Sequence, residues 1–431
     1  MRSRMGQAAA VGTVAPGPRF APVVLVLAAA IALAGTRSAR AQEEEEGFLG
    51  LDALDLGFAT EDGGFSLDLS GILDVEGYVP GKEAPGLVYA DHPLVSPRLS
   101  LFVDASLGEH LFVFLQARAD RGFDPDDHPA QVRPDEYFAR WTEAGEDWSV
   151  SAQVGKFATP LGSFVQRHDS LRNPLVRAPL PYDFMTSVGD AVAPKSNAAQ
   201  IARRDIEDRK EDWVPILWGP VYHTGAMLFG AVGDFDMRLA ATNAAPCERP
   251  EEWTWQEDDG EAIAWSARLG WRAFPGFVVG LDWARGPYYR REAEDSLAGS
   301  DREDFDQKLI GVDLEYKVGH LEAWAEVYAS DWEAPNIVGD LRALAYYVEA
   351  KYTLTPALHL AGRWGQIFFN EIRDASGRRT EWDRASWRAE LGVGYLFASN
   401  LLGKVQYEVN EHSGGREPHD DMASFSMSLG F

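Results

Sequence analysis

Alternation of apolar and polar residues with a period of two is the feature that most constrains the fold of this chain. In residues 65–75 the odd positions are apolar or glycine, and the residues between them are mostly serine or aspartate. The same alternation recurs in 99–107, 265–272, 387–397 and 403–410. Successive side chains of a β-strand point to opposite faces, so each segment has one apolar and one polar face. A strand has this pattern when lipid covers one face and water the other.

Segments of this kind recur along the whole chain and predict an all-β protein of about 16 strands. The alternation is poorest in 221–231. An even count of this size is typical of single-chain outer-membrane barrels. The predicted strands are 65–80, 97–107, 110–120, 133–143, 148–157, 221–231, 234–243, 261–273, 276–285, 306–318, 320–330, 341–354, 357–368, 384–397, 400–410 and 421–431.

The connections between these segments alternate between short and long without a break. The short ones hold a few residues, such as Gly108-Glu109, Phe274-Pro275 and Thr355-Pro356. A barrel with short periplasmic turns and long outer loops requires this order, whereas a soluble β-sandwich does not. We therefore predict a transmembrane, antiparallel, up-and-down β-barrel. The long connections are 81–96, 121–132, 158–220, 244–260, 286–305, 331–340, 370–383 and 411–420.

Residues 1–41 are predicted to be a signal peptide. A basic start precedes the apolar run 23–33, which is too short to span a bilayer as a helix. Small residues, Ala39 and Ala41, then occupy the −3 and −1 positions of a cleavage site before Gln42. The alternative is a retained N-terminal anchor. Export of a barrel by such a peptide predicts location in the outer membrane of a Gram-negative envelope.

The mature chain divides into two parts by composition. Residues 42–64 form a short acidic segment expected in the periplasm, in which the run Glu43–Glu46 reads as a solvated tail. Residues 65–431 form the predicted barrel. The formal charge of −27 becomes −32 after cleavage, because residues 1–41 hold five arginines and no acids. So acidic a protein does not bind nucleic acid by charge.

Residue usage excludes other classes of exported protein. The single cysteine, Cys247, permits no intramolecular disulfide and no cysteine-rich metal site. The mean hydropathy of −0.25 fits strands that are polar on one face, although a soluble exported β-protein would give the same value. Aromatic residues near strand ends, among them Trp141, Trp283 and Tyr328, predict girdles at the membrane interfaces. The alternative is a packed soluble core.

The chain ends on a period-two run with an aromatic last residue. Phe425, Met427, Leu429 and Phe431 share one face of the last predicted strand. Outer-membrane barrels typically end in this way, and Phe431 is therefore the candidate signal for the barrel-assembly machinery.

The loop 158–220 is far longer than ordinary connections. Its charged residues balance, eight basic against eight acidic. We expect a constriction with separate basic and acidic walls; the alternative is a surface loop held by its own ion pairs. The stretch 196–213 is suited to a short helix.

A resemblance to a known family starts at this loop. The stretch VGKFATPLG at 154–162, preceded by DEY at 135–137, resembles a signature of the phosphate-selective porin O and P family and its relatives. The resemblance implies a sixteen-stranded, homo-trimeric channel whose third outer loop folds toward the lumen. This chain departs from the family in its strong acidity, which argues against phosphate selectivity.

The polar face of the strands would line the water-filled interior of such a barrel. Rings of charged side chains set ion selectivity in pores, although charges that pair across strands would merely fill the wall. The candidate pore-lining and constriction residues are Arg118, Arg140, Arg167, His168, Arg172, Arg177, Arg268, Arg272, Arg363, Arg388, Glu322 and Glu326.

Enzymatic motifs are absent from the sequence. The chain has no HExxH, Gly-x-Ser-x-Gly or P-loop sequence. His168, Asp169 and Ser170 are adjacent in a loop, and a catalytic triad needs residues that converge in space. We therefore expect no catalytic residues, no metal and no cofactor. The function predicted is a porin that passes small hydrophilic solutes or ions by diffusion, with a leaning toward anions. The alternative is a barrel-borne outer-membrane enzyme or adhesin that acts through its outer loops.

Overall fold

A computed structural model describes residues 56–81, 92–122, 130–206, 213–219, 222–248, 263–414 and 419–431. The signal peptide with its cleavage site between Ala41 and Gln42, and most of the acidic segment 42–64, lie outside the described residues and stay predictions. In the described ranges no helix has the length and apolar character needed to cross a membrane.

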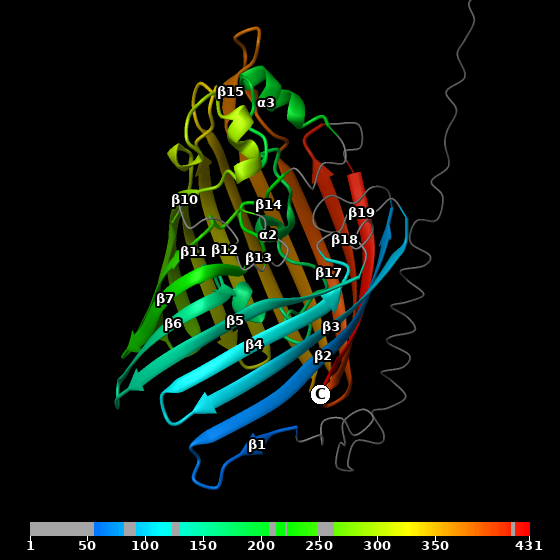
Figure 1. Ribbon diagram of the computed structural model, residues 1–431. Coiled ribbons are helices and arrows are strands. Elements are labelled where there is room, and N and C mark those ends of the chain that lie inside the picture. Colours follow the sequence, from blue (N-terminus) through cyan, green and yellow to red (C-terminus); the bar gives the residue numbers. More distant parts are fainter. Residues whose placement is uncertain are drawn as a thin grey trace, which may run out of the picture. The chain divides into compact units, whose positions relative to one another are not determined.

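The described residues include a closed antiparallel barrel of sixteen strands (Figure 1). Each strand pairs with its neighbours in the chain, and the last strand closes the ring by pairing with the first from Gly430↔Ile72 to Met422↔Pro80. All sixteen predicted strands are confirmed, including the weakest one at 221–231. The barrel strands are β2 (Phe65–Pro80), β3 (Leu94–Leu107), β4 (Leu111–Asp120), β5 (Gln131–Ala144), β6 (Trp148–Ala158), β7 (Tyr222–Val232), β8 (Phe235–Thr242), β9 (Ala264–Phe274), β10 (Phe277–Pro287), β11 (Asp306–Val318), β12 (Leu321–Trp332), β13 (Leu341–Thr355), β14 (Leu358–Phe369), β17 (Ser386–Ala398), β18 (Leu401–His412) and β19 (His419–Gly430).

Three short strands lie beside this ring, and the sequence did not predict them. Strand β1 (Phe58–Ala59) pairs with β2, and β15 (Glu371–Arg373) pairs with β16 (Arg379–Glu381) in the connection between β14 and β17.

The short connections all lie at one end of the barrel, called here the turn end, and the long ones lie at the other, the loop end (Figure 1). Four of these turns hold a glycine with positive φ, a region that strains residues with a Cβ; Gly108 and Gly319, for example, have φ of +63° and +54°. The predicted alternation of connection lengths is therefore confirmed.

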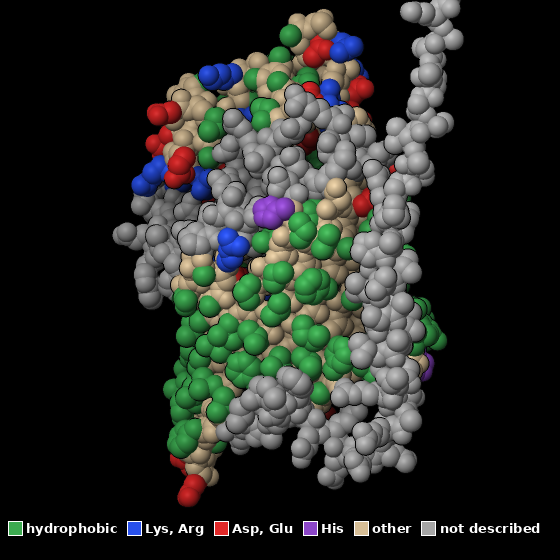
Figure 2. Space-filling model, turned by 90° about the vertical axis from the view of Figure 1, so that its right-hand side faces the viewer, with side chains coloured by type: hydrophobic (Ala, Val, Ile, Leu, Met, Phe, Trp, Pro, Cys, Tyr) green, Lys and Arg blue, Asp and Glu red, His purple; other side chains and the backbone are tan. Residues whose placement is uncertain are grey.

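Apolar side chains point outward from the barrel and polar ones point inward. Leu281 on β10 and Leu391 on β17 are 56% and 74% exposed, whereas Asp282 and Glu390 beside them are buried. Figure 2 shows hydrophobic side chains over the middle and turn end of one outer face, with charged side chains gathered mainly at the loop end. An apolar band of this kind suits contact with lipid.

Tyr328 is a correction to the predicted aromatic girdle. Trp141 and Trp283 are exposed on the outside as expected, but Tyr328 is fully buried inside the barrel. Its hydroxyl donates to Glu326 at 3.1 Å. Residues two apart on a strand share a face, so the inward direction of Glu326 also fixes that of Tyr328.

The last residue lies in the seam where the barrel closes. The backbone N–H of Phe431 donates to the Gly71 carbonyl at 3.0 Å, and the N–H of Gly71 donates back at 2.8 Å. The Phe431 ring covers Gly71, where an added Cβ would lie 2.4 Å from the ring. Phe425 covers Gly77 on the same strand in the same way. Glycines on β2 thus make room for aromatic rings on and directly after β19.

The connection between β6 and β7, residues 159–221 and here called loop 3, enters the barrel as predicted. It contains the 3₁₀ helix η2 (Val165–Arg167), the helix α2 (Leu180–Asp183) and the helix α3 (Asn197–Arg203). Helix α2 lies within the ring of strands, whereas α3 lies at the loop end (Figure 1). The short helix predicted within 196–213 is confirmed, and the Ser196 hydroxyl caps it by accepting from the Ala199 N–H at 3.2 Å.

Candidate channel interior

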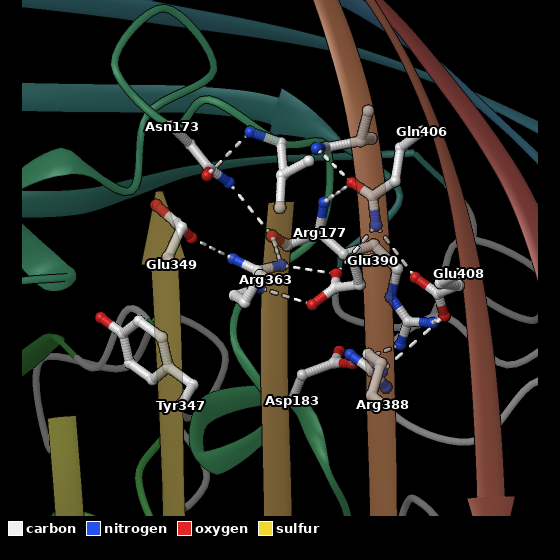
Figure 3. A network of polar contacts seen from close by, with 12 residues as sticks. Asn173, Arg177, Asp183, Tyr347, Glu349, Arg363, Arg388, Glu390, Gln406 and Glu408 are labelled. Atoms are coloured by element: carbon white, nitrogen blue, oxygen red, sulfur yellow. Dashed lines mark hydrogen bonds and ion pairs between the residues drawn. The ribbon is translucent and has the colours of Figure 1, made fainter. Parts of the chain in front are cut away.

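Buried ion pairs attach loop 3 to the inner face of the barrel. In the described part of the chain, four arginines and four carboxylates form this anchoring network, which contains Arg167, Arg177, Arg363, Arg388, Asp183, Glu349, Glu390 and Glu408. Figure 3 labels all of these residues except Arg167. All eight side chains are buried. Buried charges are tolerated only when they are paired and hydrogen-bonded.

Arg363 is the part of the network that lies on the barrel wall. Its guanidinium donates two hydrogen bonds to the Glu390 carboxylate, at 2.5 and 2.6 Å, and a third to Glu349 at 2.8 Å. It also donates to the backbone carbonyl of Arg177 at 2.7 Å. A two-pronged contact of this kind fixes both distance and orientation, so β14 presents a rigid surface to loop 3.

The loop contributes its own charged side chains to the same network. Arg177 donates to Glu408 on β18 at 2.6 Å and to Asp183, which also accepts from Arg388 at 2.6 Å. Arg167 donates to Glu349 at 2.6 Å. The ion-pair partners of Arg167 and Arg177 therefore lie largely on the barrel wall. The alternative, a loop held by its own ion pairs, does not describe most of this network.

Glu326 on β12 holds the beginning of loop 3. One of its oxygens accepts from the backbone N–H groups of Ser163 and Phe164, at 2.7 and 2.8 Å, and from the Ser163 hydroxyl at 2.9 Å. The adjacent Gly162 has φ of +66°, and a Cβ there would lie 2.3 Å from the Tyr328 hydroxyl. The glycine that ends the VGKFATPLG stretch is thus required where the chain turns into the barrel.

Lys404 on β18 holds the middle of loop 3. Its ammonium group donates to three backbone carbonyls, those of Ser170 at 2.7 Å, Asn173 at 3.0 Å and Leu175 at 2.9 Å. An ammonium group has three donors, and here each has a loop acceptor. The side chain is buried, so loop 3 lies directly on this part of the wall.

The opposite side of the interior is open. A cavity of about 1150 Å³ lies between loop 3 and the wall made by β2 to β8. Along β4 it is lined by every second residue from Phe112 to Asp120. At about 3.4 Å per residue this stretch covers roughly 27 Å of strand. The cavity therefore extends from near the turn end to the loop end of the barrel.

Most charges along this cavity are paired. Arg98 contacts Asp74 at 3.0 Å and Glu76 at 2.6 Å. Arg118 contacts Asp135 at 2.9 Å, and Arg133 contacts Asp120 at 2.6 Å. These pairs lie toward the loop end of β3, β4 and β5. In this part of the interior the charges therefore pair with one another and fill the wall, which is the alternative given above for the polar face.

The twelve predicted interior residues fall into three places. Those that line the cavity are Arg118, Arg140, His168, Arg172 and Arg177, and Arg177 also belongs to the network. Those that face inward but lie buried in ion pairs or hydrogen bonds are Arg167, Arg268, Arg363, Arg388 and Glu326. Two lie near the turn end: Arg272 is exposed, and Glu322 contacts Lys351 at 3.2 Å. The sequence did not predict that loop 3 covers several of these side chains.

Some residues of the interior were missed by sequence reasoning. Arg98 and Arg133 were not among the candidates, although Arg98 shares a strand face with Ser100 and the alternation would have found it. The phenylalanines on the inner face, such as Phe112 and Phe138, were also missed, because apolar residues were assigned to the outside.

His168 has no triad geometry. Its Nδ1 lies 2.5 Å from the carbonyl of Val165 and its Nε2 lies 3.0 Å from the Tyr222 hydroxyl. The neighbouring Asp169 accepts instead from the backbone N–H groups of Leu171 and Arg172. Burial lowers the pKa of His168, so the imidazole is neutral at physiological pH.

Comparison with known proteins places the fold among porins. No family model matches the chain, and no curated protein matches it. Among solved structures, the anion-selective porin from Comamonas acidovorans has a TM-score of 0.54 at 10% identity, covering 85% of this chain and 100% of that chain. The outer membrane channel DcaP of Acinetobacter baumannii has a TM-score of 0.53 at 13% identity, covering 87% and 99%. The trimer form of the outer membrane protein OmpT of Vibrio cholerae has a TM-score of 0.50 at 11% identity, covering 85% and 99%. These likenesses show a porin-like barrel, and the resemblance to the phosphate-selective porin O and P family stays a prediction.

Proposed function

We propose that this protein is an outer-membrane porin, a water-filled channel for the passive diffusion of small hydrophilic solutes or ions. The observation that carries the proposal is the cavity beside loop 3, which follows the whole of β4 inside a closed barrel with an apolar outer surface. A loop anchored by buried ion pairs narrows such a channel without closing it. The fold shared with porins supports the same function.

We propose a preference for anions as the finer part of this function. Arg172 on loop 3 has a 71% exposed side chain, whereas its partner Asp169 is 26% exposed and lies 3.4 Å away. Charges at a constriction act on ions more strongly than distant ones, because the field is less screened there. The acidity of the chain as a whole is not decisive for ion choice, since most carboxylates along the cavity are paired.

We also propose the cellular setting that this function requires. The chain is exported by its signal peptide, assembled by the barrel-assembly machinery with Phe431 as part of its signal, and inserted in the lipid bilayer of the outer membrane. A homo-trimer is proposed from the family resemblance and from the trimer form of the Vibrio cholerae protein. No nucleic acid, metal or cofactor enters the proposal.

Single-channel conductance of the refolded mature chain in a planar bilayer tests the proposal. Stable ohmic steps are expected, with a reversal potential under a salt gradient whose sign indicates anion preference. Heat-modifiable gel migration establishes that the protein used is folded. A folded, inserted protein without conductance would refute the channel and favour an enzyme or adhesin that acts through the outer loops.

A further inference from the structure

An aromatic surface lies inside the barrel, where polar residues are the rule. Phe102, Phe112, Phe114 and Phe229 line the cavity, together with Phe138. The rings of Phe114 and Phe138 are 5.3 Å apart, and those of Phe102 and Phe114 are stacked at 6.2 Å. Their strand neighbours Val113 and Leu115 face outward. The barrel therefore has a second apolar surface besides the outer one, and this second surface lies inside and lines the cavity.

Arg140 lies among these rings. Its guanidinium carbon is 4.7 Å from the ring centroid of Phe138, 5.1 Å from that of Phe229 and 5.6 Å from that of Phe112. The only hydrogen bond that fixes it within the described residues is from Nε to Gln153, at 2.9 Å. The terminal nitrogens of the guanidinium donate no hydrogen bond within the described residues, and Arg140 lines the cavity. A planar cation that packs on aromatic rings is pre-organised for a planar anion.

Arg238 is a second cation beside the same surface. It lies directly across from Phe229 in the β7–β8 pair and lines the same cavity. In the ranges that the structure describes, neither Arg140 nor Arg238 has a carboxylate within 4.0 Å. This separates them from Arg98, Arg118 and Arg133, whose charges are paired. Phe229 thus lies beside two arginines for which the described residues supply no ion-pair partner.

Of the carboxylates that line the cavity, two have no ion-pair partner among the described residues, and these limit what the cavity can hold. Glu136 on β5 accepts from the backbone N–H of Ala158 at 3.3 Å, so one oxygen is directed toward the start of loop 3. Asp104 lies on β3, across from Phe114. Neither is within ion-pair distance of the two arginines. A dianion would meet these carboxylates as well as the arginines, which favours a singly charged ligand.

We propose that Arg140, Arg238 and the surrounding phenylalanines form a binding subsite for aromatic monocarboxylates inside the channel. The carboxylate contacts the two guanidinium groups, and the ring of the solute packs on Phe112 and Phe229. The inference rests on the proposed channel function and gives it a substrate class. Sites that combine apolar walls with a few fixed polar groups are typical of small-molecule recognition.

Block of chloride current in a planar bilayer by phenylacetate, compared with acetate, tests the subsite. Phenylacetate should reduce the current at concentrations about tenfold lower than acetate, because only phenylacetate adds ring contacts. Phenylethylammonium, with the same ring and the opposite charge, should not block in this range. Equal block by phenylacetate and acetate in a conducting channel would overturn the subsite while leaving the porin intact.

Variants separate the two parts of the subsite. Arg140→Gln combined with Arg238→Gln should abolish the difference between phenylacetate and acetate, and Phe229→Leu should reduce phenylacetate block with little change for acetate. Arg373→Gln, in the β15–β16 hairpin outside the barrel, is the matched control and should behave as wild type. Unchanged block in the double variant, shown to be folded by heat-modifiable migration, would overturn the proposal. A folded wild type without conductance would overturn the porin and the subsite together.

Discussion

Lys404 offers the sharpest test of how loop 3 is held inside the barrel. Its ammonium group is buried and donates to the carbonyls of Ser170, Asn173 and Leu175. Lys404→Met keeps the length of the side chain and removes all three donors. Segment 170–175 would then lose its attachment to β18, whereas the anchors at Glu326 and Arg177 would remain.

The size of the effect follows from these three contacts. A hydrogen bond to a charged group contributes about 1.5–3 kcal/mol, but Ser170 and Asn173 line the cavity, where water can replace the lost donors in part. We therefore expect a net loss of about 3 kcal/mol for the attached state of this segment. Since 1.4 kcal/mol corresponds to a factor of ten, the detached population should rise about 100-fold.

Chemical modification of an introduced cysteine measures this population. Ser170→Cys places a thiol in the segment, at a position that is 6% exposed. The native Cys247 is fully buried and is replaced by serine in both backgrounds. When opening is fast relative to modification, the rate follows the detached population, so a charged thiosulfonate reagent should react about 100-fold faster in the Lys404→Met variant.

The same variant should show brief openings to a higher conductance, because a detached segment 170–175 leaves a wider passage. Lys308→Met is the control, since Lys308 is half-exposed and pairs with Glu333, away from loop 3. Modification rates that agree within twofold between Lys404→Met and the control would refute the view that Lys404 holds the loop.

Three further predictions concern other parts of the structure. Arg177→Met leaves Glu408 without its closest cation, and breaking a buried ion pair costs about 3–5 kcal/mol. The midpoint temperature of heat modifiability should therefore fall, and an unchanged midpoint would count against the anchoring network. Gly71→Val places atoms against the Phe431 ring at the closing seam, and a lower yield of closed barrel on refolding is expected, whereas wild-type yield would show that the seam adapts. Burial raises the pKa of Asp383 from 3.8 to about 6, so the folded state favours the neutral carboxyl and loses roughly 3 kcal/mol of stability as pH rises from below 3.8 through 6. Asp383→Asn should flatten this part of the stability profile in a denaturant series, and a profile identical to wild type would refute the assignment.

The order of strands was predictable because the signal is local. Alternation with a period of two follows from strand geometry and does not depend on distant residues. Connection lengths give the antiparallel order independently. The prediction was wrong where the type of side chain did not reveal the face on which it lies. Tyr328 is apolar enough for the outer face, and yet it lies inside the barrel with Glu326.

The sequence by itself thus determined the barrel, its strand number and its two different ends. The tertiary structure alone decided which inward charges meet water. Arg363 and Arg140 have the same pattern in the sequence, but Arg363 lies under loop 3 and Arg140 lines the cavity. The physical reason is that the path of the loop is set by contacts between residues far apart in the chain, such as Arg177 with Glu408, and no local pattern encodes those contacts.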